Sequence, residues 1–275
     1  MNDSWHTRAI VTVLDEILTT KRTEVADLRA RRGDLEAVAR GAEPPRDFAG
    51  ALRRADGRLA VVAEIKRRSP SKGELAPGLD PAATARAYAS GGASCLSVLT
   101  DGPYFGGDLS DLQAARAAAD LPVLRKDFTV DPLQLLEARG AGADAVLLIV
   151  AALPDDGLLR ELHTAATELQ LTVLVEAHDE GELDRALAIG PRVVGVNARD
   201  LGDFAEDLSV GERVAKRIPP DVVAVAESAI RSVDDARRMA DAGYDAVLVG
   251  EALVRAADPA QLVAALAAVP RQNRR

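Results

Sequence analysis

The sequence is poor in cysteine, histidine and aromatic residues, and each shortage excludes a class of structure. Its 275 residues contain one cysteine, Cys95, so an internal disulfide is excluded and a reducing cytoplasm is the expected compartment. The histidines His6, His163 and His178 lack the spacing of metal ligands, so we expect no metal site and interpret His178 as a loop or rim residue. Aromatic residues make up 3% and hydrophobic residues 48% of the chain, so Ala, Val and Leu must pack the core.

Long hydrophobic runs and a positive net charge are missing as well. The apolar patch at residues 10–18 is interrupted by Thr12, Asp15 and Glu16, so we expect neither a membrane helix nor a signal peptide. The net charge of −9 argues against nucleic acid as a partner, because phosphate backbones are bound by clustered Lys and Arg. A small anionic substrate fits the sequence if the basic residues converge in one pocket.

Short β-branched and apolar segments alternate with helical patterns along the chain, which is typical of parallel βα units. We expect eight strands, near residues 61–66, 94–99, 122–126, 145–150, 172–176, 193–197, 222–227 and 245–249. Eight such units predict a (β/α)8 TIM barrel. The alternative, an open doubly wound sheet, usually has a glycine-rich turn after its first strand, whereas residues 66–70 here read KRRSP.

Turn and capping residues mark the ends of the expected helices. Residues 91–94 (GGAS), 142–145 (GADA) and 243–246 (GYDA) are weak internal repeats that place glycine where a helix ends and a strand begins. Asp80-Pro81 and Asp131-Pro132 each offer a capping side chain followed by proline in the first helical turn. These signals agree with the spacing of the strands.

The residues before the first strand also show a helical pattern. Val13, Leu14, Ile17 and Leu18 recur at helical spacing, and the sequence PPRDF at residues 44–48 breaks the pattern. We therefore expect an N-terminal helical extension over residues 1–60 that packs on one end of the barrel as a lid or plug. Residues 61–270 would form the barrel, and the two parts together would be one structural domain.

Charged and polar side chains follow the expected strands, at the end where the active sites of TIM barrels lie. They are Glu64, Lys66, Lys126, Glu176, Asn197, Arg199, Glu227 and Ser228. Side chains alternate along a strand, so Glu64 and Lys66 share one face. Buried unpaired charge is costly, and even a buried ion pair is often neutral for stability, so this cluster favours a functional site.

Some of these residues also have a purely structural interpretation. Glu64 and Lys66 alone could form an ion pair at the rim, because structural networks also perturb pKa values. Arg199 could form a salt bridge with Asp200 or Glu227.

The last two strands suggest a phosphate site. In this fold the loops after strands seven and eight often bind phosphate with backbone N–H groups. Ser228 and Ala229 follow the seventh strand, and Gly250 and Glu251 follow the eighth. The alternative for Gly250 is an ordinary glycine in a tight turn.

Taken together, the strand-end motifs closely resemble those of the indole-3-glycerol phosphate synthase family. The motifs are residues 63–73 (AEIKRRSPSKG), 96–100 (LSVLT), 105–107 (FGG), 124–128 (LRKDF), 147–150 (LLIV), 175–176 (VE), 195–201 (GVNARDL), 226–228 (AES) and 248–251 (LVGE). They occur in the family's order, and the helical extension is also similar to that family. The resemblance implies cyclisation of 1-(2-carboxyphenylamino)-1-deoxyribulose 5-phosphate with loss of carbon dioxide and water. This is a step of tryptophan biosynthesis that uses no cofactor.

The resemblance also implies roles for individual residues. Lys126 would be the general acid on the substrate ketone, Glu176 would transfer protons during dehydration, and Lys66, held by Glu64, would bind the substrate carboxylate or protonate the departing hydroxyl. The residues expected to position substrate are Ser69, Asn197, Arg199, Glu227 and Ser228, and those expected at the phosphate are Ala229, Gly250 and Glu251. Clustered cations would lower the pKa of a lysine, and nearby carboxylates would tune it back.

Two positions depart from the family pattern. Ala229 replaces the usual glycine after Glu-Ser, and Asp108 replaces the usual serine after the aromatic-Gly-Gly motif, on a loop expected near the mouth. Two other functions fit the sequence less closely. One is an aldolase that uses Lys126 as a Schiff base, and the other is a weakly active paralogue that binds a sugar phosphate.

Overall fold

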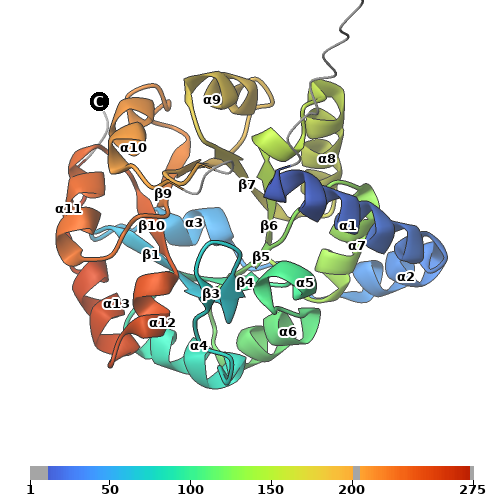
Figure 1. The fold of residues 1–275 in the computed structure, drawn as a ribbon, viewed down its shortest axis with the longest axis horizontal. Helices are drawn as coiled ribbons and strands as arrows, with labels where there is room; N and C mark the ends of the chain where they lie inside the picture. Colours follow the sequence, from blue (N-terminus) through green and yellow to red (C-terminus); the bar gives the residue numbers. More distant parts are fainter. Residues whose placement is uncertain (1–11, 201–204, 273–275) are drawn as a thin grey trace, which may run out of the picture.

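The computed structural model describes residues 12–200 and 205–272 and shows a closed barrel of eight parallel strands (Figure 1). The strands are β1 (Ala60–Ile65), β4 (Cys95–Leu99), β5 (Val123–Lys126), β6 (Ala145–Ile149), β7 (Thr172–Ala177), β8 (Val193–Asn197), β9 (Val223–Glu227) and β10 (Ala246–Val249). β1 pairs with both β4 and β10, which closes the barrel. The predicted (β/α)8 fold is confirmed, and every predicted strand is found at its expected place.

Side chains alternate between the two faces of each strand and so form two apolar layers, one inside the barrel and one between the strands and the helices. Val62, Leu124 and Leu248 belong to the cluster that fills the barrel. Ala63 and Leu96 belong to the larger cluster between the strands and the surrounding helices. Small aliphatic side chains fill both layers, in agreement with the shortage of aromatic residues in the sequence.

The helices that connect the strands form the outer ring in Figure 1. They are α4 (Pro81–Ser90), α6 (Leu109–Ala118), α7 (Pro132–Gly140), α8 (Asp156–Glu168), α9 (Glu180–Leu187), α10 (Leu208–Ala215), α11 (Val233–Asp241) and α13 (Pro259–Ala267). Asp80 accepts a hydrogen bond from the Ala82 N–H at 2.9 Å, and Asp131 forms a capping box with Gln134. The predicted helix starts at these two positions are therefore confirmed.

The glycine-containing repeats end helices at the amino end of the barrel. Gly92, Gly142 and Gly243 have φ values of 86°, 87° and 100°, a left-handed conformation that favours glycine. In the second repeat, Asp144 is fully buried and accepts hydrogen bonds from the backbone N–H groups of Arg46 and Val123, both at 2.8 Å. These bonds fix the start of the strands, on the side of the barrel away from the charged mouth.

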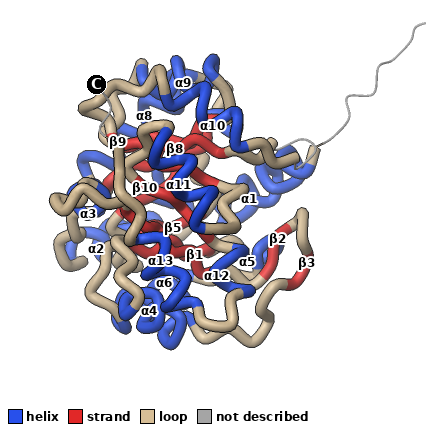
Figure 2. Tube along the Cα trace, turned by 90° about the vertical axis from the view of Figure 1, so that its left-hand side faces the viewer, coloured by secondary structure: helices blue, strands red, loops and turns tan. Residues whose placement is uncertain are grey.

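Between residue 12 and β1 the structure has three helices, α1 (Val13–Arg29), α2 (Arg32–Gly41) and α3 (Phe48–Leu52). α3 packs on the amino end, where the fully buried Phe48 and Leu52 belong to the apolar cluster inside the barrel. α1 lies at the opposite end, beside the loops that follow the strands (Figure 2). The helices α1 and α3 of the extension thus lie at opposite ends of the barrel, rather than at the one end we expected. The division into residues 1–60 and 61–270 stays a prediction.

Short elements surround the carboxyl end. They are the hairpin of β2 (Arg68–Ser69) and β3 (Gly73–Glu74), the helices α5 (Gly102–Phe105) and α12 (Glu251–Arg255), and the 3-10 turn η1 (Val150–Ala152). β2, β3, α5 and α12 lie on the same side as α1 in Figure 2 and surround the mouth. No helix in the described ranges is both long and apolar enough to cross a bilayer.

Candidate active site

Three charged side chains from the ends of alternate strands, β5, β7 and β9, meet inside the mouth of the barrel. The Lys126 Nζ atom lies 2.6 Å from Glu176 Oε2 and 2.8 Å from Glu227 Oε2. The register of the sheet brings Glu176 and Glu227 together through β8. Glu176 pairs with Gly195 of β8, and Glu227 pairs with Asn197, two residues further along β8. Asn197 Nδ2 also donates a hydrogen bond to Glu176 Oε1 at 3.1 Å.

Two glycines make room for these carboxylates. A Cβ atom on Gly195 would lie 1.9 Å from Glu227 Oε1, and one on Gly250 would lie 2.2 Å from Glu64 Oε1. Gly250 has a φ of −120°, which lies outside the left-handed region that favours glycine in turns. At both glycines, the carboxylate of a glutamate side chain therefore packs directly against the backbone.

The surroundings shift the pKa values of Lys126, Glu176 and Glu227 in different ways. Burial acts to lower the pKa of Lys126, but the carboxylates of Glu176, Glu227 and Glu64 outweigh it and raise that pKa above its usual value. Burial raises the pKa of Glu227 to about 8, with the Glu176 carboxylate adding to the shift and Lys126 opposing it. Glu176 keeps a low pKa because Lys126 and then His178 outweigh its burial. The expectation that clustered cations lower the pKa of the lysine is wrong, because carboxylates are its nearest neighbours.

His178 contacts this cluster, although the sequence suggested only a loop or rim residue. Its Nε2 lies 3.4 Å from Glu176 Oε1, and its Nδ1 lies 2.9 Å from Glu182 Oε2. Burial acts to lower the pKa of His178, but Glu182 and Glu176 outweigh it and raise that pKa. Glu176 therefore lies between two basic groups, Lys126 and His178. The sequence signal that could have identified His178 was its position two residues after Glu176.

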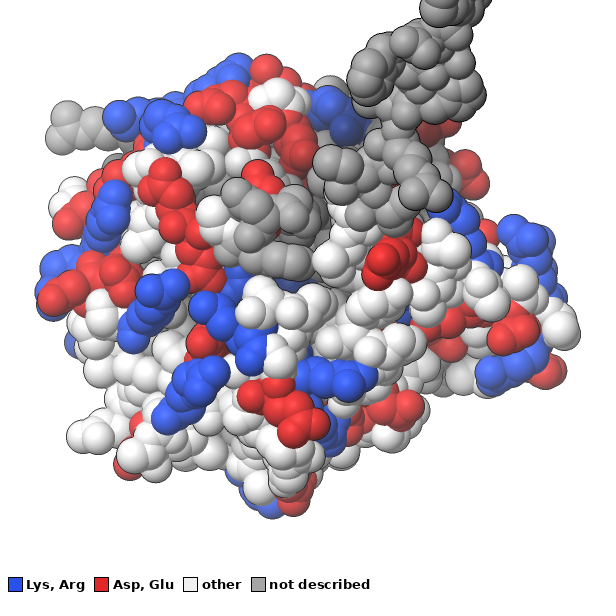
Figure 3. Space-filling model, in the orientation of Figure 1, with Lys and Arg blue, Asp and Glu red and all other residues white. Residues whose placement is uncertain are grey.

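Basic side chains lie at the rim above this cluster. Lys66 Nζ lies 2.5 Å from Glu64 Oε1, which is the ion pair that the sequence alone suggested. Arg199 forms an ion pair with Glu206, a residue that the sequence analysis did not single out, and donates to Ser71 Oγ at 3.1 Å. Basic and acidic side chains are interspersed over this face of the molecule (Figure 3). The cations Lys66 and Arg199 at the rim are thus each paired with a carboxylate.

The loop after β9 is strained at the position where the family pattern has glycine. Ser228 and Ala229 have φ values of 65° and 59°, in the left-handed region. Both residues line the mouth, together with Gly250 and Glu251 from the loop after β10. The two loops lie where phosphate sites occur in this fold.

Apolar side chains from the extension and from two loops form one wall of the cavity. Val13, Leu14 and Ile17 come from α1, and Phe105 and Phe128 come from the loops after β4 and β5. The two phenylalanine rings have centroids 6.2 Å apart and are tilted by 37°. This wall can bind an aromatic group beside the charged cluster.

The cavity collects most of the candidate residues from the sequence. Its lining includes Glu64, Lys66, Lys126, Glu176, Asn197, Arg199, Glu227, Ser228, Ala229, Gly250 and Glu251. Ser69 is buried in β2 with its hydroxyl 3.5 Å from that of Ser71, which does line the cavity, so a substrate contact of Ser69 stays a prediction. Asp108 caps α6 by accepting from the Ser110 N–H at 2.8 Å, so its charge serves the helix rather than the mouth. Within the described ranges, no three His, Cys, Asp or Glu side chains converge to hold a metal ion.

An ammonium group held between two carboxylates in the mouth of a (β/α)8 barrel defines an enzyme of acid–base chemistry. The indole-3-glycerol phosphate synthase family model matches residues 14–266, and the chain belongs to this family. It is 52% identical to the indole-3-glycerol phosphate synthase of a Nocardioides species, over 90% of this chain and 95% of that one. It is 50% identical to the Mycobacterium ulcerans protein of the same name, over 93% of each chain.

Among solved structures, the thiamine phosphate pyrophosphorylase of Pyrococcus furiosus is similar in fold. It aligns with a TM-score of 0.57 at 17% identity, over 80% of this chain and 96% of that one. At this identity the likeness concerns the barrel alone.

Proposed function

We propose that the protein catalyses the reaction of its family, the decarboxylating ring closure of 1-(2-carboxyphenylamino)-1-deoxyribulose 5-phosphate to indole-3-glycerol phosphate in tryptophan biosynthesis. The observation that carries this proposal is the placement of Lys126 between Glu176 and Glu227, at 2.6 and 2.8 Å, on the floor of a mouth with one apolar wall. A carboxylated aromatic ring and a phosphorylated chain require an apolar wall, cations and a phosphate loop. The mouth combines all three.

In the first step, the aromatic ring carbon attacks the ketone carbon of the substrate. Lys126 donates a proton to the ketone oxygen as the new carbon–carbon bond forms, and the oxygen becomes a hydroxyl group. The ring carboxylate then leaves as carbon dioxide, and its bonding electrons restore the aromatic ring. Lys126 is suited to this role because the surrounding carboxylates keep it protonated.

In the second step, the hydroxyl group leaves as water. Its departure needs one proton from an acid, for which Lys66 is positioned by Glu64. The double bond of the new ring forms when a base accepts a proton from the intermediate. Glu176 is that base, since its low pKa keeps it ionised at neutral pH. Asn197, Arg199, Glu227 and Ser228 position the substrate, and the loops that contain Ala229, Gly250 and Glu251 bind its phosphate.

The same geometry disfavours the aldolase alternative. A Schiff base forms only from a neutral amine, whereas the carboxylates of Glu176 and Glu227 hold Lys126 in its charged form. Mixing the purified protein with the ribulose phosphate substrate should produce indole fluorescence and one equivalent of carbon dioxide. Borohydride added during turnover should leave no covalent adduct on Lys126. Absence of both products, or a trapped adduct, would contradict the proposal.

A further inference from the structure

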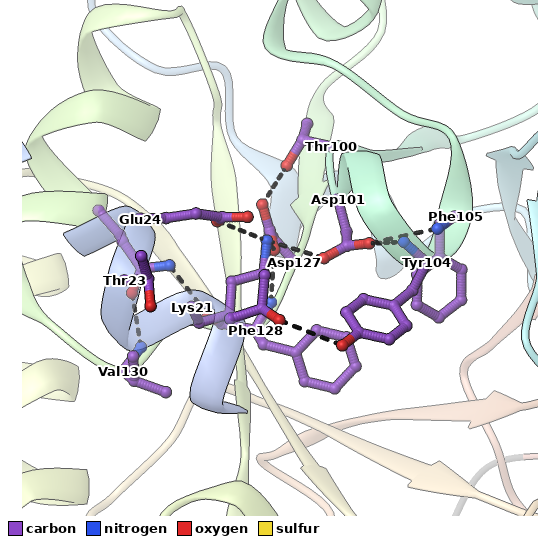
Figure 4. Close-up of polar contacts among 12 residues, drawn as sticks. Lys21, Thr23, Glu24, Thr100, Asp101, Tyr104, Phe105, Asp127, Phe128 and Val130 are labelled. Atoms are coloured by element: carbon purple, nitrogen blue, oxygen red, sulfur yellow. Dashed lines mark hydrogen bonds and ion pairs between the residues drawn. The ribbon is translucent and has the colours of Figure 1, made fainter. Parts of the chain in front are cut away.

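Lys21 is a buried cation that the proposed mechanism does not use. It lies on the apolar face of α1, between Leu18 and Val25, and only 1% of its surface is exposed. Its Nζ atom is 2.8 Å from Asp101 Oδ2, 2.9 Å from Asp127 Oδ1 and 2.9 Å from Glu24 Oε2 (Figure 4). Asp101 and Asp127 are themselves buried, so Lys21 joins the N-terminal extension to two separate segments of the barrel.

The first of these segments is the loop after β4. Asp101 caps α5 by accepting hydrogen bonds from the N–H groups of Tyr104 at 2.8 Å and Phe105 at 3.2 Å. Its other oxygen faces Lys21. A second contact joins the same elements, because the hydroxyl groups of Thr20 and Tyr104 lie 3.1 Å apart. The aromatic wall contributed by Phe105 is therefore fixed to α1.

The second segment is the loop after β5. Asp127 follows Lys126 directly, and its Oδ1 accepts from the Phe128 N–H at 2.8 Å as well as facing Lys21. Its Oδ2 accepts from the Thr100 hydroxyl at 2.6 Å and from Arg125 at 3.2 Å. Phe128 and the backbone that carries Lys126 are thus held by the same carboxylate.

We propose that Lys21 is a positioning residue, whose ion pairs with Asp101 and Asp127 lock α1 and the loops after β4 and β5 into one unit. This unit sets the apolar wall around the substrate ring and the direction of the Lys126 side chain. The inference rests on the proposed function for its kinetic consequence, but the structural coupling holds without it. Removal of Lys21 would leave the buried Asp101 carboxylate without its ion-pair partner and Asp127 with Arg125 alone, which favours movement or protonation of Asp101.

Substitution Lys21→Met tests this role, because methionine keeps most of the length and apolar character of the stem. We expect a kcat reduced at least tenfold and a KM increased at least threefold, since a displacement of about 1 Å near the chemistry can cost on the order of 100-fold in rate. The matched control is Asp144→Asn, which weakens a buried polar network at the amino end of the barrel. The control should lower the melting temperature while kcat and KM of the folded protein stay within twofold of wild type.

Hydrogen exchange on substrate-free protein tests the coupling separately. Backbone amides of residues 101–106 and 127–130 should exchange faster in Lys21→Met than in wild type or in Asp144→Asn. Tyr104→Phe provides a milder variant that is expected to fold, and its loss of the contact with Thr20 should accelerate exchange at residues 101–106 and raise KM about twofold.

Unchanged exchange in both segments of Lys21→Met, or kinetic constants within twofold of wild type, would overturn the proposal. If Lys21→Met fails to fold, unchanged exchange and KM in Tyr104→Phe would do so. Wild-type protein without turnover would instead refute the proposed function, and the exchange experiment would still decide whether Lys21 couples the two loops to α1.

Discussion

Glu176 and Glu227 face the same ammonium group, yet their pKa values are shifted in opposite directions. Glu176 has a lowered pKa, whereas burial and the neighbouring carboxylate raise the pKa of Glu227 to about 8. Lys126 thus lies between a carboxyl group with a lowered pKa and one with a raised pKa. This asymmetry gives the two glutamates different tasks, because only the ionised group can accept a proton.

The raised pKa of Glu227 predicts a pH dependence of stability. A group whose pKa is higher in the folded than in the unfolded state stabilises fully below the unfolded value, here 4.5, and loses this effect as the pH rises through about 8. Each pKa unit corresponds to about 1.4 kcal/mol. The free energy of unfolding of wild type should therefore fall relative to Glu227→Gln as the pH rises from 5 to about 9.

The control for this experiment is Glu176→Gln, whose contribution has the opposite sign. Glu176 has a folded pKa of about 2, so its stabilisation is present above 4.5 and lost only as the pH falls through about 2. A difference between wild type and Glu227→Gln that does not change with pH would show that Glu227 is ionised in the folded protein.

At the scale of elements, the loop after β9 combines function with backbone strain. Ala229 has a left-handed φ of 59°, so the backbone is strained at this residue. For a residue with a Cβ atom this conformation costs on the order of 1 kcal/mol. The strain is of the kind that functional loops retain when the surrounding structure enforces it.

Ala229→Gly should therefore raise the free energy of unfolding by up to about 1 kcal/mol, with KM for the substrate lowered by a few-fold at most. The stability change would report the relief of strain, because the folded loop has a left-handed conformation that glycine favours. Ala256→Gly is the matched control, since Ala256 has a φ of −67° and glycine there should destabilise by about 0.5–1 kcal/mol. Equal losses of stability in both variants, measured by chemical denaturation, would contradict the assignment of strain to Ala229.

The elements also show why part of the site could be predicted and part could not. Lys126, Glu176 and Glu227 end apolar strands, and the alternation of a strand fixes which face they occupy. Lys21 gave a weaker signal, a lysine within the apolar stripe of a helix, and its partners come from loops about 80 and 106 residues further along the chain. Only the closed barrel brings them together.

Other features depend on contacts across the barrel that no local pattern records. Glu227 from the next strand packs against Gly195, where a side chain would meet its carboxylate. Glu206 was identified only in the structure, as the ion-pair partner of Arg199. The placement of α3 at the amino end could not be predicted from a periodic pattern either, because a short helix has too few residues to define an apolar face. The eight strands were predictable because each is a short apolar segment with turn residues on both sides.

On the scale of the whole molecule, the two ends of the barrel have different tasks. At the amino end, buried groups such as Asp144 and Phe48 are satisfied by hydrogen bonds or apolar contacts, and they stabilise the fold. At the carboxyl end, like charges are held close together and the backbone is strained at Ala229, which costs stability. The buried Lys21 connects α1 of the extension to this second end, whereas α3 packs on the amino end.

The central claim, that Lys126 donates the proton in ring closure, is tested most directly by single-turnover kinetics of Lys126→Ala with the ribulose phosphate substrate. General acid catalysis contributes roughly two to four orders of magnitude, so the rate of indole formation should fall at least 100-fold. Substrate affinity, measured by titration under the same conditions, should stay within about tenfold because the apolar wall and the loops after β9 and β10 are intact. Indole formation above about a tenth of the wild-type rate would contradict the acid role of Lys126.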